Sequence, residues 1–332
     1  MDNSERRVQE LRKELLRGNR VALGKALTLV ESSLQSDQQS AKRLIEDILP
    51  NTGQSLRIGI TGVPGVGKST FIEVFGKHII DQGNKVAVLT IDPSSQLTGG
   101  SILGDKTRMP DLSRNEAAFI RPTASGSALG GVAMKTRESI LLCEAAGYNV
   151  IIVETVGVGQ SEIAIRNMVD FFLLLMLAGA GDELQGIKKG IMEMADAILI
   201  TKADGENLRR ATEAQAEYKH ALHLIRHHEG WWQPQVTICS SQENKGIAET
   251  WQLIREFHAK SQENGEFINL RKKQRITWIN ERFDYLLKAK LYEDELVKKK
   301  KIELEREVLD NKITPFAAAD LLAEFALGSL RK

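Results

Sequence analysis

The sequence predicts an α/β fold with a doubly wound, mostly parallel sheet, extended by helices at both ends. Short apolar segments alternate with amphipathic helical segments from about residue 56 onward, which is typical of parallel strands joined by crossover helices. Most of these apolar segments are near-continuous aliphatic runs, as expected of strands buried on both faces. The predicted strands are Arg57–Thr61, Val86–Ile91, Ala118–Arg121, Val150–Glu154, Phe171–Leu177, Ala197–Thr201 and Val236–Cys239.

The composition is that of an ordinary globular protein. Of the 332 residues, 42% are hydrophobic and 27% are charged, and the net charge is +1, so the bulk charge predicts no nucleic-acid partner. The longest apolar run, residues 171–178, is shorter than the ~18 residues that suggest a membrane span, so no membrane association is expected. The two cysteines, Cys143 and Cys239, suit a reducing compartment, and we expect a cytoplasmic protein.

Three parts follow one another along the chain. Residues 1–52 form a predicted helical extension, because Val8, Leu11 and Leu15 keep a helical period. Residues 53–262 form the predicted α/β domain. Residues 263–332 lack strand signals and are predicted to form helices. These helices either cover the domain's own core or contact another subunit. Gly328 is predicted to end the last of these helices.

A phosphate-binding loop is predicted between the first strand and the helix that follows it. The pattern Gly62-x-x-x-x-Gly67-Lys68-Ser69 is complete and stands in the strand-to-helix context that the motif requires, although a chance glycine-rich turn is the alternative. Backbone N–H groups of the loop and the helix N-terminus would hold phosphate oxygens. Lys68 would reach the β- and γ-phosphates, and Ser69 would ligate Mg²⁺. The predicted nucleotide-binding residues of this loop are Gly62, Val63, Pro64, Gly65, Val66, Gly67, Lys68, Ser69 and Thr70.

Three carboxylates are candidate metal ligands near this loop. Asp92 and Glu154 each end a predicted strand, and Asp105 follows in a long polar segment, where it could instead cap a turn. Together they would repel a triphosphate, so a divalent cation is expected, with Ser69, Asp92, Asp105 and Glu154 as its ligands. We predict that Lys68, Asp92 and Glu154 carry catalysis.

The base-reading residues are predicted at the ends of two later strands. Lys202 and Asp204 match the end of the guanine-reading Asn-Lys-x-Asp motif, but Thr201 stands where Asn is usual, so one expected contact with the base is in doubt. A solvated turn is the alternative. The segment Cys239–Ser241 stands where GTPases place a loop whose backbone N–H groups meet the guanine O6. Ser240, Ser241 and Gln242 are therefore added to the predicted nucleotide site.

Taken together, these blocks resemble the MeaB/ArgK family of P-loop GTPases, in the class that also holds the signal-recognition-particle, MinD, BioD and nickel-insertion NTPases. The resemblance covers about residues 10–330. It is carried by GVPGVGKST at 62–70, DPSSQLTGGSILGDKTRM at 92–109, ETVGVGQSE at 154–162, AGAGDELQGIKKGIMEMAD at 178–196 and TKAD at 201–204.

The resemblance implies a homodimeric Mg²⁺-dependent GTPase that acts as a chaperone for the adenosylcobalamin-dependent methylmalonyl-CoA mutase. Such a chaperone gates cofactor loading and protects the mutase, and residues 263–332 would be its dimerisation arm. The family also implies three switch segments, at about 92–109, 154–166 and 178–188. Their candidate residues are Gln160, Glu162, Asp182 and Lys188.

Two other functions stay open. Val158 follows Gly157 where Ras-like GTPases carry a water-orienting Gln, so intrinsic hydrolysis is expected to be slow, and a binding module with negligible hydrolysis is one alternative. A nickel-type metallochaperone of the same class is the other. His220, His223, His227 and His228 share one predicted helix, but no Cys or carboxylate cluster completes a ligand set, so a plain surface helix is favoured.

Overall fold

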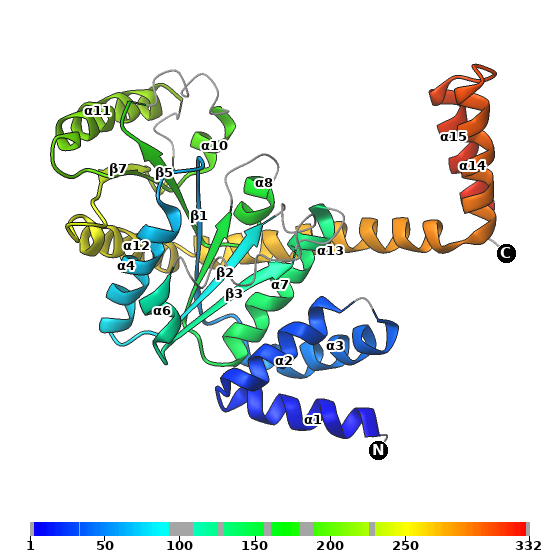
Figure 1. Ribbon diagram of the computed structural model, residues 1–332, viewed down its shortest axis with the longest axis horizontal. Coiled ribbons are helices and arrows are strands. Elements are labelled where there is room, and N and C mark those ends of the chain that lie inside the picture. The colour runs from blue at the N-terminus through cyan, green and yellow to red at the C-terminus, as the bar shows by residue number, and fades with distance from the viewer. Residues whose placement is uncertain are drawn as a thin grey trace. The chain divides into compact units, whose positions relative to one another are not determined.

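One parallel sheet organises the protein. The computed structural model describes residues 3–32, 34–92, 109–124, 129–155, 161–179, 189–225 and 230–329. Within them, seven strands lie in the order β3-β2-β4-β1-β5-β6-β7, and all pairs are parallel (Figure 1), which confirms the predicted doubly wound sheet. The strands are β1 Leu56–Gly62, β2 Val86–Asp92, β3 Ala118–Ala124, β4 Val150–Thr155, β5 Phe171–Leu177, β6 Ala197–Thr201 and β7 Gln235–Ile238.

Helices cover both faces of the sheet, so the central strands are buried throughout. Every residue of β4 and β6 is buried, as their continuous aliphatic sequences predict. One face carries α4 Lys68–Asp81, α6 Pro110–Arg114 and α12 Ile247–Glu263. The other carries α7 Leu129–Ala145, α8 Ser161–Arg166, α10 Lys189–Met194 and α11 Asn207–Ile225.

The winding of the chain determines where a ligand can bind. The neighbouring strands β1 and β4 are followed by α4 and α8, which lie on opposite faces of the sheet. Connections that diverge in this way open a crevice at the carboxyl ends of the two strands, and doubly wound folds bind their ligands there. The predicted phosphate loop and Glu154 both stand at this edge.

Three N-terminal helices extend the core on the α7 face. They are α1 Asn3–Leu16, α2 Arg20–Glu31 and α3 Gln35–Ile48, followed by the short 3-10 helix η1 Leu49–Asn51. The Asn19 side chain caps α2 by accepting hydrogen bonds from the backbone N–H groups of Val21 and Ala22. Arg121 of β3 pairs with Glu31 at the end of α2, at 2.5 Å. The Arg121–Glu31 pair joins the extension to the sheet.

Residues 275–332 form a second compact unit, and residues 1–274 form the first. The C-terminal helices are α13 Glu266–Glu293, α14 Glu295–Leu309 and α15 Pro315–Ser329. Asp294 separates α13 from α14, since its carboxylate accepts a hydrogen bond from the Leu296 N–H at 2.8 Å. The predicted helix end at Gly328 is wrong, because α15 includes Gly328, whose backbone stays out of the left-handed region. The three-part division at residues 52 and 262 stays a prediction.

No helix in the described ranges is long and apolar enough to cross a membrane.

Candidate functional site

The segment from Gly62 to Lys68 has the backbone of a phosphate-binding loop. Gly62 and Gly67 have φ values of +154° and +94°, which other residues rarely adopt. A Cβ at Gly62 would lie 2.5 Å from the carbonyl oxygen of Leu175 on the neighbouring strand, so a side chain has no room there. The tight turn therefore depends on glycine, and it brings the start of α4 close to the end of β1.

The Lys68 side chain is held inside this loop. Its ammonium group donates to the carbonyl oxygen of Gly62 at 2.7 Å and to that of Val63 at 3.2 Å, and the residue is only 9% exposed. The positive charge thus sits in the concavity of the loop, beside the N-terminus of α4. Both features favour an anion at this position.

Ser69 and Glu154 meet across the crevice between α4 and β4. The Ser69 hydroxyl donates to a Glu154 carboxylate oxygen at 3.3 Å, although 85 residues separate them in the sequence. Glu154 is buried, at the carboxyl end of β4. A hydroxyl and a carboxylate are hard oxygen ligands, so this pair fits a Mg²⁺ ion. Their role as metal ligands stays a prediction.

The other predicted switch and metal residues are described only in part. Asp92 ends β2, beside β4, but its side chain lies outside the described residues. Asp105, Gln160, Asp182 and Lys188 also lie outside them. Glu162 is described, and it is buried in the first turn of α8, directly after the segment that follows Glu154.

The predicted base-reading residues come together at the ends of β6 and β7. The buried Ser240 hydroxyl donates to an Asp204 carboxylate oxygen at 2.7 Å and accepts the N–H of Glu243 at 3.1 Å. Lys202 has a φ of +57°, which is uncommon for a residue with a side chain, and its carbonyl accepts from Asn207 at 2.6 Å. These bonds orient Asp204, whose carboxylate could accept from two N–H groups of guanine.

The backbone N–H groups near Ser240 are already partly used. Cys239 donates to the Ile200 carbonyl at 2.8 Å, and Ser240 donates to the Lys245 carbonyl at 3.0 Å. Of the amides expected to meet the guanine O6, those of Ser241 and Gln242 therefore suit that role better. Ser240 instead acts through its side chain on Asp204, a contact that sequence spacing did not indicate. Burial, assisted by the negative charge of Asp204, raises the pKa of the Cys239 thiol to about 12.

Thr201 makes a contact that the sequence argument missed. Its hydroxyl donates to the carbonyl oxygen of Val66, in the phosphate loop, at 2.6 Å. The motif indicates Thr201 only as a weakened contact with the base. A threonine at the end of a predicted buried strand indicates that its hydroxyl needs a hydrogen-bond partner. The sequence alone does not show that this partner is Val66.

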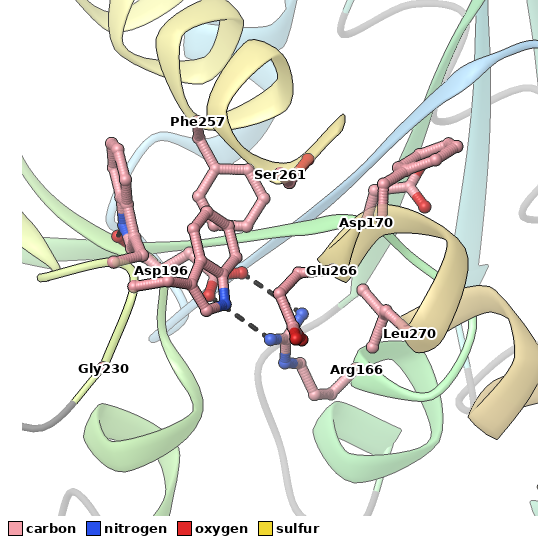
Figure 2. Close-up of a pocket in the computed structure, with 11 residues that line it drawn as sticks. Arg166, Asp170, Asp196, Gly230, Phe257, Ser261, Glu266 and Leu270 are labelled. Carbon is pink, nitrogen blue, oxygen red and sulfur yellow. Dashed lines mark hydrogen bonds and ion pairs between the residues drawn. The ribbon is translucent and has the colours of Figure 1, made fainter. Parts of the chain in front are cut away.

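A cavity of about 250 Å³ lies at the opposite, amino-terminal edge of the sheet (Figure 2). Asp196, just before β6, accepts a hydrogen bond from Nη2 of Arg166 at 3.3 Å, and the shortest N–O distance in this ion pair is 3.2 Å. The Trp232 indole N–H donates to the Asp196 carbonyl at 2.9 Å. The Phe257 ring meets Trp232 edge-on and Trp231 at a tilt. The two tryptophans thus form part of the cavity wall, and Trp231 remains 41% exposed.

Fold and site together define a phosphate-loop nucleotide-binding protein of the guanine-reading kind. The family model described as methylmalonyl Co-A mutase-associated GTPase MeaB matches residues 23–295. The chain belongs to the MeaB family. It is a GTPase, which binds GTP and GDP and hydrolyses GTP to GDP and phosphate.

Relatives and a solved structure agree with this assignment. GTPase ArgK of Escherichia coli is 46% identical over 94% of this chain and 95% of its own length. The mouse mitochondrial methylmalonic aciduria type A homolog is 43% identical over 97% of this chain and 80% of its own length. A crystal structure of LAO/AO transport system kinase is 40% identical and superposes with a TM-score of 0.77, covering 98% of this chain and 99% of that one.

Proposed function

We propose that this GTPase is a G-protein chaperone for an adenosylcobalamin-dependent acyl-CoA mutase, with methylmalonyl-CoA mutase as the favoured client. In this proposal it gates loading of the mutase cofactor and protects the mutase from inactivation. The main support is the family match, whose description names that mutase and which spans residues 23–295. The methylmalonic aciduria relative, similar along 97% of the chain, points the same way.

The proposal includes Mg²⁺ as cofactor at the Ser69–Glu154 contact. The two oxygens lie 3.3 Å apart at the mouth of the phosphate loop, and Asp92 ends the strand beside Glu154. Asp92 and Asp105 complete the proposed ligand set. When bound, the ion would offset negative charge on the phosphates.

Hydrolysis then depends on how this chain holds the triphosphate. Lys68 exchanges its bonds to the Gly62 and Val63 carbonyls for phosphate oxygens, where its charge stabilises the negative charge that develops during transfer. The loop N–H groups act in the same way. Asp204, oriented by Ser240, selects guanine. We expect slow intrinsic turnover that the mutase accelerates by ordering the switch segments.

A homodimer formed through the C-terminal helices is part of the proposal. Large apolar side chains stand exposed at a helical spacing on α13, where Ile276, Ile279 and Phe283 are each at least 60% exposed. On α15, Phe316 is 83% exposed. Exposed apolar side chains repeated along helices are typical of interfaces, and a second copy of this chain is the proposed occupant.

The remaining parts of the proposal concern the compartment of the protein and the kinds of partner that it lacks. We propose a cytoplasmic protein without nucleic-acid or membrane partners. Both cysteines are unpaired and buried, which suits a reducing compartment, and the net charge is +1.

Phosphate release under multiple turnover, with and without purified mutase, tests the proposal. We expect acceleration of ~10³-fold or more, the scale seen when a partner completes a GTPase site. Equal rates in the two reactions would count against the chaperone role, and negligible hydrolysis in both would favour the binding module.

A pull-down from the native cell with GTP and with GDP should recover the mutase in a nucleotide-dependent way. Equilibrium dialysis with Ni²⁺ and Zn²⁺ tests the metallochaperone alternative.

A further inference from the structure

The Thr201 hydroxyl joins the ends of two strands to the phosphate loop. Thr201 is the last residue of β6 and is 3% exposed. Its Oγ1 lies 2.6 Å from the carbonyl oxygen of Val66 in the loop and 3.3 Å from that of Met176 in β5. A hydroxyl carries one hydrogen, so the shorter contact with Val66 is the main bond.

Val66 is the point at which the loop is fixed to the body of the protein. Its side chain is fully buried in the core on the α4 face, and its N–H donates to the Val63 carbonyl at 3.3 Å. The glycines on either side, Gly65 and Gly67, have no contacts within 4 Å of the position that a Cβ would occupy. The loop is therefore open on both sides of Val66, and the bond from Thr201 holds the Val66 carbonyl.

The same hydroxyl is unsuited to reading a base. Its hydrogen is directed at backbone carbonyls, and the side chain ends there, whereas an asparagine at this position would carry a longer amide. The base-facing role falls to Asp204, three residues later, which the Ser240 hydroxyl orients at 2.7 Å. In segment 201–204, the first residue thus contacts the phosphate loop, and the last residue faces the base.

We propose that Thr201 is a positioning residue for the phosphate loop, and that it acts on every nucleotide alike, whatever the base. Base selection then rests on Asp204, which Ser240 orients, and on the backbone N–H groups of segment 239–242, and not on Thr201. The proposal depends on the chain being a GTPase and not on its proposed mutase partner, so the two can fail separately.

The test is the affinity of purified protein for two nucleotides that differ only in the base. Guanosine diphosphate and inosine diphosphate share their phosphates, but inosine lacks the 2-amino group. Thr201→Val removes the hydroxyl and leaves two buried carbonyls without it, so we expect both dissociation constants to rise about tenfold. Their ratio should stay at the wild-type value. Asp204→Asn should instead change that ratio.

Three further variants keep the test decisive. Thr201→Ser retains the hydroxyl and should bind both nucleotides as wild type does. Thr250→Val is the matched control, since the buried Thr250 hydroxyl donates to the carbonyl of Gly246, the N-cap residue of α12, at 2.6 Å, and its loss should leave both affinities unchanged. Thr201→Ala removes the same hydroxyl. It replaces Thr201→Val in the test if thermal unfolding shows that the Thr201→Val protein does not fold.

Two results would overturn the proposal. Undiminished binding by a folded Thr201→Val or Thr201→Ala protein would show that the loop does not need the hydroxyl. A loss confined to guanosine diphosphate would show that Thr201 reads the base.

Discussion

The two edges of the sheet use charged side chains in opposite ways. At the amino-terminal edge, Arg271 bonds Asp170 through two nitrogens at 2.6 Å, and Arg57 bonds Glu144 at 2.8 Å. All four groups are buried or nearly so, and they satisfy one another. At the carboxyl-terminal edge, Lys68 is held by neutral carbonyls of its own loop.

The charges at the amino-terminal edge stabilise the fold, whereas the charge of Lys68 is available to a ligand. A buried charge paired with an opposite charge anchors structure, since removing either partner leaves the other unpaired. The ammonium group of Lys68, bonded to backbone carbonyls of the loop, can exchange those bonds for an anion. For Arg271, burial lowers the pKa, but the nearby Asp170 and Glu144 outweigh it and leave that pKa raised.

The largest expected effect is on stability, at the amino-terminal edge. Arg271→Ala should lower the free energy of unfolding by about 3–5 kcal/mol, because Asp170 and Glu144 remain buried with less compensation. Urea denaturation followed by circular dichroism measures the change. Lys272→Ala, an exposed neighbour on the same helix, should change stability by about 0.5 kcal/mol or less. Similar values for the two variants would contradict an anchoring role for the Arg271 cluster.

At the carboxyl-terminal edge, the matching change should affect activity and spare stability. Lys68→Ala should lower kcat/KM for GTP by about 10²–10³-fold or more, since it removes a charge that stabilises the transferring phosphate. Lys85→Ala, an exposed lysine before β2 at the other edge, is the control and should hydrolyse GTP normally. Phosphate release kinetics distinguish the two. If Lys68→Ala remained fully active, the phosphate loop would have to be reassigned.

A smaller effect is expected from Asp204, the carboxylate that is proposed to bind guanine. Asp204→Asn should weaken GTP binding by about 10²-fold and favour xanthosine triphosphate, because an amide presents one acceptor and one donor where the carboxylate presents two acceptors. Competition between the two nucleotides reports the preference. Glu206→Gln, an exposed acid two residues away, should leave it unchanged. An unaltered base preference in Asp204→Asn would remove Asp204 from the guanine site.

The smallest effect is expected from the residue that orients Asp204. Ser240→Ala should weaken GTP by about tenfold at most, since the carboxylate remains but loses one hydrogen bond. Isothermal titration calorimetry can resolve this change. Ser139→Ala, which removes a buried hydroxyl bonded within α7, is the control. A loss as large as that of Asp204→Asn would mean that Ser240 does more than orient the carboxylate.

Much of the fold could be predicted because it depends on local signals. Continuous aliphatic runs mark the strands, and the predicted segment Ala197–Thr201 has the same bounds as β6. The phosphate loop was predictable because a glycine pattern specifies its backbone directly. The end of α15 was not, because a glycine ends a helix only when its backbone turns left-handed, and that depends on the surroundings.

Sequence patterns were enough to predict the strands, the phosphate loop and the candidate nucleotide-binding residues, since each depends on neighbours along the chain. Which distant groups meet became evident only from the packing of the folded chain. It paired Thr201 with Val66, Ser240 with Asp204, and Arg271 with Asp170. Such pairs join residues 36 to 135 positions apart, and their geometry follows from how strands and helices pack in space, which no local pattern records.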